Sequence, residues 1–213
     1  MRAGDALVKA LEAEGVSYIT GFAGGGLAPL FPALRESESI KLFAARHERL
    51  GVEIADGYAR ATGKPGVILV TSGPGATNTV TPVRDAMADS IPLVVICGQV
   101  ARASIGTDAF QEAPITNVMG SVAKHVFLVT EPEKLEATMR AAFEIAASGR
   151  PGPVVVDIPK DIQNSMIIPN PEASLNIAAY RGRLNKIEER ELNDSECKKF
   201  FKYLDQSERP LLY

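Results

Sequence analysis

One carboxylate, Glu48, stands at a position where an acid can do chemistry. It follows an apolar run that predicts a strand over residues 40–43, and it precedes a segment that predicts a helix over residues 50–62. In α/β proteins, ligands bind outside the carboxyl ends of the strands, which is where such a turn lies. Glu48 is therefore a candidate catalytic carboxylate. The alternative is an acid that only complements the helix dipole, worth roughly 0.3–1 kcal/mol, and residue types alone do not decide between them.

Three other segments have compositions typical of ligand-binding loops. Residues 21–26 contain four glycines, residues 72–78 form a tight turn, and residues 98–113 are polar, small and irregular. Glycine lets a backbone pass close to a ligand, and long loops inside a compact domain are often functional. A loose turn without a ligand is the alternative for residues 21–26.

Several common catalytic signatures are absent from the sequence. Gly73-Pro74-Gly75 lacks the Lys-Ser/Thr of a P-loop, and there is no HExxH, CxxC or Gly-x-Ser-x-Gly pattern. The run Gly24-Gly25-Gly26 does not complete a dinucleotide-binding GxGxxG. His47 and His125 are candidate acid–base groups, although a lone histidine beside a strand is more often structural. Motifs of these kinds leave the function undecided.

Strand and helix patterns alternate over residues 3–158. Apolar and β-branched runs predict strands, and apolar residues at helical spacing predict the helices between them. The expected strands cover residues 16–20, 40–43, 66–71, 91–97, 122–129 and 153–158. This alternation is typical of an α/β fold with a doubly wound, mainly parallel sheet and helices on both faces. In such a sheet the glycine-rich loops meet at one edge.

Local patterns give more specific expectations about three helices. A helix is expected over residues 27–34. In the helix after Glu48 the apolar residues at helical spacing are expected to form the buried face; they are Leu50, Ile54, Tyr58 and Ala61. Residues 130–133, Thr-Glu-Pro-Glu, predict a capping box at the start of a helix that continues to residue 146.

The composition argues against several kinds of partner. A net charge of −3 and a pI near 5.5 give no reason to expect nucleic acid or a membrane surface. No apolar run approaches the ~20 residues that span a bilayer, and the amino terminus has no apolar signal run. Cys97 and Cys197 lie far apart and fit a reduced chain. These features predict a cytoplasmic location.

The composition changes after residue 159, which indicates a domain boundary. Residues 1–165 are expected to form one α/β domain. Residues 166–191 are expected to be a linker, because Pro169-Asn170-Pro171 interrupts the chain and residues 181–191 include seven charged side chains. Residues 192–213 contain a new apolar helical face and then the start of a strand at Arg209. Since one helix and one strand cannot bury a core, this segment predicts the beginning of a truncated middle domain.

A series of ordered motifs runs through residues 46–161. The first four are Arg46-His47-Glu48, the segment Ala-Asp-Gly-Tyr-Ala-Arg-Ala-Thr-Gly-Lys-Pro-Gly at 55–66, Thr-Ser-Gly-Pro-Gly-Ala-Thr-Asn at 71–78 and Asp-Ser-Ile-Pro-Leu at 89–93. Together they resemble thiamine-diphosphate enzymes. Gly-Gln-Val at 98–100 and Gly-Thr-Asp-Ala-Phe-Gln-Glu at 106–112 narrow the resemblance to acetolactate synthases. Lys124-His125 and residues 150–161 fit it too, so the resemblance covers residues ~3–165, the family's pyrimidine-binding domain.

The resemblance implies how the cofactor would be bound. In this family a glutamate hydrogen-bonds N1′ of the aminopyrimidine of thiamine diphosphate and so promotes loss of the thiazolium C2 proton. Glu48 would have this role, in a desolvated site that raises the pKa of its carboxyl. Pro74 and Asn78 would line the pyrimidine pocket. Gly24 and Gly25 would let the backbone approach the reacting centre.

The resemblance also implies a substrate side of the site. Phe110, Gln111 and Lys124 would face the substrate beside the thiazolium ring. Gln111 and Lys124 would act with Glu48 as catalytic residues, with Gln111 as a hydrogen-bond donor to an oxygen of the substrate. Phe110 would shape the pocket for small acyl groups, although a loop phenylalanine equally serves packing.

The resemblance further implies partners and additional cofactors. The active site would lie at the interface of a homodimer, with Mg²⁺ and the diphosphate held by another domain of the partner chain. The sequence contains no Gly-Asp-Gly…Asn motif for that Mg²⁺, so the isolated chain is expected to be inactive, as a fragment or as one subunit of a split enzyme. FAD is left open, because Gly120 stands where an arginine is common in the family. Ala23 and Ala101 likewise replace common prolines.

The function that follows from the resemblance is the joining of two small 2-keto acids with loss of carbon dioxide. Another enzyme of the superfamily is the closest alternative: a sulfoacetaldehyde acetyltransferase, a 2-keto acid decarboxylase or an oxidase. An alternative of another class is a non-catalytic α/β dimerisation module. The joint presence of Glu48, Gln111 and Lys124 argues against that module.

Overall fold

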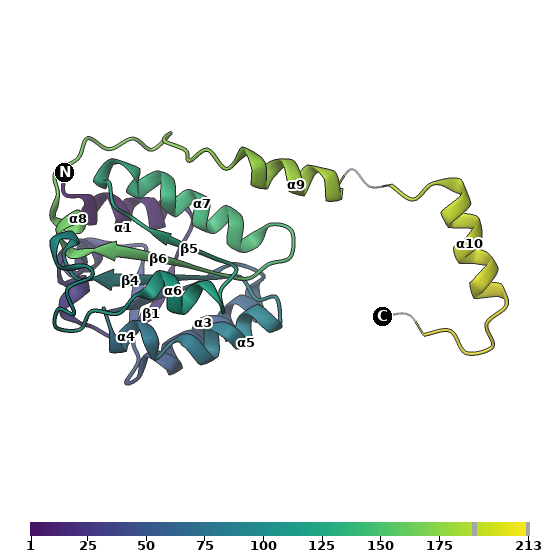
Figure 1. Ribbon diagram of the computed structural model, residues 1–213, viewed down its shortest axis with the longest axis horizontal. Coiled ribbons are helices and arrows are strands. Elements are labelled where there is room, and N and C mark those ends of the chain that lie inside the picture. The colour runs from purple at the N-terminus through teal and green to yellow at the C-terminus, as the bar shows by residue number, and fades with distance from the viewer. Residues whose placement is uncertain (189–190, 212–213) are drawn as a thin grey trace. The chain divides into compact units, whose positions relative to one another are not determined.

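The computed structural model describes residues 1–188 and 191–211 (Figure 1). The chain divides into two compact units, Met1–Asn176 and Ile177–Tyr213. The first unit holds the sheet and the candidate site.

The first unit is built on one sheet of six strands, all parallel, in the order β2-β1-β3-β4-β6-β5. The strands are β1 (Tyr18–Gly21), β2 (Lys41–Ala44), β3 (Gly66–Val70), β4 (Leu93–Gln99), β5 (His125–Leu128) and β6 (Pro153–Pro159). This arrangement confirms the predicted α/β class with a parallel sheet.

Helices cover both faces of the sheet. Helices α1 and α7 lie on one face, and α3, α5 and α6 lie on the other (Figure 1). The helices of this unit are α1 (Ala3–Ala13), α2 (Phe31–Glu36), α3 (Glu48–Thr62), α4 (Pro74–Thr77), α5 (Val80–Ala88), α6 (Ile115–Gly120), α7 (Leu135–Ala147) and α8 (Lys160–Asn164). Three short 3₁₀ helices, at Gly25–Leu30, Arg102–Ser104 and Pro132–Lys134, join them.

The central strands are buried on both faces. Every residue of β3, β4 and β6 is buried, as expected for continuous apolar runs in a parallel sheet covered by helices. Edge strand β2, in contrast, is exposed along its whole length. The rigid core therefore lies under the carboxyl ends of β3, β4 and β6, which carry the loops of the candidate site.

The predicted buried face of α3 is wrong. Leu50 and Ile54 are 48% and 53% exposed. The buried residues of this helix are mostly small: Glu48, Gly51, Val52, Ala55 and Ala59. Small side chains let the helix lie close to the strands, so its larger apolar residues stay outside the packed core.

Two other local predictions need correction. Residues 130–133 form no capping box, because the helix starts later, through a 3₁₀ turn, and Glu131 makes no side-chain cap hydrogen bond. The helix expected over residues 27–34 is split into a 3₁₀ helix that contains Pro29 and then α2. Proline and consecutive glycines disfavour the α-helical hydrogen bonds that an apolar periodicity alone would predict.

The second unit contains α9 (Ala178–Glu188) and α10 (Asp194–Asp205). Helix α9 lies inside the segment predicted as a linker. A helix forms there because alanine, leucine, arginine and lysine favour helix even when they are solvated. Asn193 accepts hydrogen bonds from the amides of Ser195 and Glu196, which gives α10 a capping box. Residues 209–211 form no strand. Residues 189–190 of the predicted linker and 212–213 of the predicted strand lie outside the described residues.

Candidate active site

Four loops meet at one edge of the sheet because all strands run the same way. Residues 22–26 follow β1, Glu48 follows β2, residues 71–75 follow β3, and residues 100–114 follow β4. The sequence predicted this convergence, and hydrogen bonds and close packing connect these loops to one another.

Glu48 is the first residue of α3 and is only 8% exposed. Its Oε2 accepts a hydrogen bond of 3.0 Å from Nδ2 of Asn78. Among the described residues, no donor is hydrogen-bonded to Oε1. Gly75 lies beside this oxygen, and a Cβ at that glycine would be 3.4 Å from Oε1. The carboxylate thus has one oxygen fixed by the protein and one available to a donor from a ligand.

The two histidines lie outside this arrangement. His47 caps α3, since its Nδ1 accepts a 3.2 Å hydrogen bond from the amide of Arg49. His125 begins β5, at the amino edge of the sheet, where its ring packs 4.4 Å from the ring of Phe127. Asn78, and neither histidine, is the hydrogen-bond partner of the Glu48 carboxylate among the described residues.

The turn after β3 has a backbone that only glycine adopts easily. Gly73 has a φ of +57° and a ψ of −114°. A Cβ there would lie 2.5 Å from the carbonyl oxygen of Gln111. Pro74 follows as the first residue of α4 and is exposed. The loop that carries Gln111 therefore packs directly on the turn that leads to Gly75 and Glu48.

We expect Gly73→Ala to lower the free energy of unfolding by about 1–3 kcal/mol, because it adds a strained φ and a backbone clash. Urea unfolding measures the change. Gly57→Ala is the matched control: this glycine lies inside α3 with no atom within 4 Å of an added Cβ, so we expect a gain of roughly 0.5–1 kcal/mol. Equal stability of the two variants would contradict the packing described for Gly73.

The glycine-rich loop after β1 is held by Thr71. The amide of Gly26 donates a 3.1 Å hydrogen bond to Thr71 Oγ1. A Cβ at Gly24 would lie 2.3 Å from Cβ of Thr71, whereas a Cβ at Gly25 would meet no atom within 4 Å. Packing against Thr71 therefore explains why residue 24 is a glycine. Gly25, in contrast, faces open space. Thr71 was not among the predicted site residues.

The loop after β4 presents two of the predicted residues. Phe110 is 88% exposed, and Gln111 is exposed with a φ of +59°. The carboxylate of Glu112 accepts hydrogen bonds from the amides of Gly106, Thr107 and Ala109. These hydrogen bonds, that of Gly106 first, hold the pKa of Glu112 below its usual value. The loop is thus an organised structure despite its irregular backbone.

Lys124 is not brought to this edge. It precedes β5 at the amino edge of the sheet, where its amide donates to the carbonyl of Pro153. Its Nζ donates to the backbone oxygens of Ile145 and Ser148 near the end of α7. The sequence resemblance grouped Lys124 with Gln111, but in this unit the two lie at opposite edges of the sheet.

Two buried polar residues at the carboxyl edge were not predicted as part of the site. Gln99 ends β4, and Asp157 lies on the neighbouring strand β6, opposite Cys97; Gln99 and Asp157 are 3% and 1% exposed. Nε2 of Gln99 donates to Oδ2 of Asp157 over 2.9 Å. Burial raises the pKa of Asp157 to about 7, and the hydrogen bond from Gln99 opposes this shift. The signal in the sequence was an acid inside an otherwise apolar strand.

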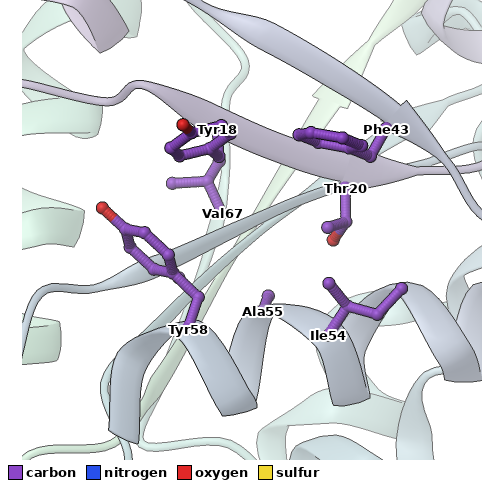
Figure 2. Close-up of a pocket in the computed structure, with 8 residues that line it drawn as sticks. Tyr18, Thr20, Phe43, Ile54, Ala55, Tyr58 and Val67 are labelled. Carbon is purple, nitrogen blue, oxygen red and sulfur yellow. The ribbon is translucent and has the colours of Figure 1, made fainter. Parts of the chain in front are cut away.

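An apolar pocket of about 280 Å³ lies elsewhere, between α3 and strands β1, β2 and β3 (Figure 2). Aromatic and aliphatic side chains, among them Tyr18, Phe43, Ile54 and Tyr58, line it. The lining extends to Gly66, the first residue of β3, and so toward the amino edge. It does not include Glu48, so this pocket is distinct from the candidate site.

Comparison with known proteins identifies the family of this chain. Residues 1–121 match the family described as "Thiamine pyrophosphate enzyme, N-terminal TPP binding domain". The chain belongs to this family. The thiamine pyrophosphate enzymes bind their cofactor through such a domain, as the description states, and thiamine pyrophosphate is thiamine diphosphate by another name.

Individual relatives of the chain are acetolactate synthases. It is 47% identical to the chloroplastic acetolactate synthase of Arabidopsis thaliana over 209 residues, which are 98% of this chain and 31% of that protein. It is 42% identical to the probable acetolactate synthase large subunit of Methanocaldococcus jannaschii over 216 residues, 100% of this chain and 35% of that protein. The chain thus spans about a third of the length of the relatives it matches.

The residues around Glu48 fit the pyrimidine half of this cofactor. A ring nitrogen that shares a proton needs a carboxylate with a free oxygen, and Oε1 is such an oxygen. Gly75 leaves space beside that oxygen which a side chain would fill. Among residues 1–188 and 191–211, no group of three or more His, Cys, Asp or Glu residues is arranged to hold a metal ion. In the same ranges, none of the helices has the length and apolar character needed to cross a membrane.

Proposed function

We propose that this chain is the cofactor-activating part of an acetolactate synthase, which decarboxylates pyruvate and joins the remaining two-carbon unit to a second 2-keto acid. The observation that carries the proposal is Glu48, buried, with one oxygen fixed by Asn78 and the other available to a ligand. When bound, thiamine diphosphate supplies the electron sink that decarboxylation of a 2-keto acid requires.

The proposed role of Glu48 is to hold a proton between its Oε1 and N1′ of the aminopyrimidine. Asn78 donates to Oε2 and so orients the carboxylate with Oε1 toward the ligand. Pro74, which opens the turn beside Gly75, and Gly25, with open space before it, would border the ring; Gly24 would act through the shape of the same loop.

The proposed substrate side is the loop of Phe110 and Gln111. The support is its contact with Gly73, because this contact connects the loop to the turn beside Glu48. Gln111 would hydrogen-bond a carboxylate or carbonyl oxygen of a 2-keto acid, and Phe110 would limit the acyl group to a small size. Lys124, with its Nζ bonded to the end of α7, is left outside the proposed site.

The remaining parts of the proposed enzyme lie in other domains or another chain. Mg²⁺ and the diphosphate would be bound by a domain beyond residues 1–213, consistent with the greater length of the relatives. FAD is not included in the proposal, because exposed Gly120 offers no side chain to hold it. Residues 1–165 would be the pyrimidine-binding domain, 166–191 a linker and 192–213 the start of a middle domain. Cys97 and Cys197, both unpaired in the described chain, suit a cytoplasmic location.

A homodimer is proposed as the assembly that completes the active site. Exposed apolar side chains on β2 and α3, two of which also line the pocket in Figure 2, support it, because exposed apolar patches mark interaction sites. These are Leu42, Phe43, Leu50 and Ile54, with exposed fractions of 41%, 51%, 48% and 53%. Sedimentation of the full-length enzyme as a monomer under assay conditions would contradict this assembly.

The reaction is tested with the full-length enzyme that contains this chain, supplied with pyruvate, thiamine diphosphate and Mg²⁺. We expect 2-acetolactate and carbon dioxide in equal amounts. Acetaldehyde in place of 2-acetolactate would indicate a decarboxylase, and acetyl phosphate formed from sulfoacetaldehyde and phosphate would indicate the acetyltransferase. Absence of all these products, with cofactor bound, would reject the proposed class of reaction.

A further inference from the structure

One side chain, Gln99, holds both ends of the loop that carries Phe110 and Gln111. Its Oε1 accepts a 2.9 Å hydrogen bond from the amide of Val100, where the loop leaves β4. Its Nε2 donates to the carbonyl oxygen of Ala113 over 3.1 Å, where the loop returns before α6. Because Gln99 is 3% exposed, water does not compete strongly for these hydrogen bonds.

Asp157 fixes the orientation of the Gln99 amide. Its Oδ2 accepts from Nε2 of Gln99, so this nitrogen bridges Asp157 and Ala113. An amide rotated by 180° would set its oxygen against the acceptors on both residues and lose both hydrogen bonds. Oδ1 of Asp157 accepts no hydrogen bond from any described residue. A proton carried on Oδ1 therefore leaves Oδ2 as the acceptor, and the bridge is kept in either protonation state.

Hydrogen bonds inside the loop couple the position of Gln111 to the position of the two loop ends. Glu112 gathers the amides of Gly106, Thr107 and Ala109, so residues 106–112 are cross-linked. The backbone of Gln111 is in turn packed on Gly73. A shift of Ala113, next to this cross-linked segment, would therefore displace Gln111 from the turn beside the site.

We propose that Gln99, oriented by Asp157, is a positioning residue that sets the register of the Phe110–Gln111 loop and thereby the affinity for the 2-keto acid substrate. This inference rests on the proposed function for its substrate class. It separates two tasks at one edge of the sheet: Glu48 acts on the cofactor, and Gln99 acts on the substrate through a loop that it does not share with Glu48. A purely structural Gln99 would contribute to stability without affecting substrate affinity selectively.

The test uses Gln99→Met in the full-length enzyme, because methionine has a similar volume but makes none of the three hydrogen bonds. We expect KM for pyruvate to rise about five- to tenfold, the change that one hydrogen bond of 1–1.5 kcal/mol represents. Exchange of the cofactor's C2 proton for deuterium should change by less than about twofold, since the protein-held proton at Glu48 is untouched. Without cofactor or substrate, the amides of residues 106–112 should exchange with deuterium faster.

Two further variants keep the test decisive. Gln99→Leu also makes none of the three hydrogen bonds and should raise KM in the same direction if Gln99→Met does not fold. Thr138→Val is the matched control, because it removes a buried hydroxyl of α7 that donates to the carbonyl of Lys134, the residue before that helix, at a site away from the loop.

The outcomes separate the two proposals. A higher KM in both Gln99 variants, with C2 exchange retained and KM unchanged in Thr138→Val, supports the positioning role. An unchanged KM and unchanged loop exchange, or a parallel loss of C2 exchange, overturns it. Failure of the proposed function has a different signature: the enzyme would not convert pyruvate, whereas the faster amide exchange of the loop in Gln99→Met would still be measurable.

Discussion

In the full-length enzyme, Glu48→Gln is expected to slow exchange of the cofactor's C2 proton by about 10²–10⁴-fold, the usual contribution of a positioned proton-transfer group. The amide keeps nearly the same shape and can still contact Asn78. It cannot share a proton with N1′ of the aminopyrimidine, because a carboxamide is not a base at neutral pH. NMR of the C2 proton after rapid mixing with deuterium oxide measures the rate directly.

Folding should survive this substitution, which separates the catalytic role from helix capping. An acid in the first turn of α3 contributes roughly 0.3–1 kcal/mol through the helix dipole, so unfolding measurements should show only a small loss. Glu136→Gln is the matched control. Glu136 is also a buried acid in the first turn of a helix, 6% exposed, and its Oε2 accepts from the amide of Asn170.

The contrast between the two variants decides the role of Glu48. Glu136→Gln should leave C2 exchange at the parent rate. If the cofactor's C2 proton exchanged as fast in Glu48→Gln as in the parent enzyme, with cofactor still bound, Glu48 would be only a helix-terminal acid. The measurement does not require turnover, so it reports on this chain's carboxylate and not on the substrate loop.

The sequence predicted the sheet because its central strands are nearly pure apolar runs. β4 and β6 carry valine and isoleucine on both faces, a pattern that leaves few alternatives to a covered parallel strand. Once the strands are parallel, the loops after them must meet at one edge. The position of Glu48 in the first turn of α3 follows from that rule, and so did its selection as a candidate.

The prediction from sequence was wrong where the buried face of a helix depends on how closely it packs on the strands. On α3, Leu50 and Ile54 read as a buried stripe, but Gly51 and Ala55 face the sheet because only small residues allow the close approach. Periodicity gives the spacing of a buried face, and with two apolar faces on one helix it cannot choose between them. The exposed apolar residues of α3 do not belong to the core of this unit; contact with a second copy of the chain is the role proposed for them.

The candidate site was predicted unevenly for a similar reason. Glu48 and Asn78 are 30 residues apart and yet hydrogen-bonded, as the ordered motifs implied. Lys124 follows the same motif order but lies before its strand, and a residue before a parallel strand belongs to the opposite edge. Gln99 and Asp157 could not be assigned a role from residue types, since their function depends on the hydrogen bonds that each atom makes.

Asp157 predicts a pH dependence of stability with a definite sign. Burial raises the pKa of this carboxyl to about 7 in the folded chain, whereas the unfolded value is about 3.9. Between these values the folded chain binds a proton that the unfolded chain has released, so the free energy of unfolding falls as the pH rises. At about 1.4 kcal/mol per unit of pKa difference, the loss between pH 4 and pH 8 is on the order of a few kcal/mol.

Asp157→Asn should remove this dependence, because an amide does not titrate. Urea unfolding of the 213-residue chain at pH 5, 6, 7 and 8 is expected to show a flatter profile for this variant, with the largest gain over the parent at pH 8. Asp161→Asn is the control: burial opposes the shift, but hydrogen bonds from Arg102 hold the pKa of Asp161 below its usual value.

Because Asp161 is already ionised throughout pH 5–8, its substitution should leave the slope in that range unchanged. A parent chain whose stability is constant from pH 5 to pH 8 would mean that Asp157 is ionised when folded, with an unobserved donor at Oδ1. A slope that persists in Asp157→Asn would place the titrating group elsewhere. The bridge to Gln99 does not depend on this proton, so the loop should keep its register across the same range of pH.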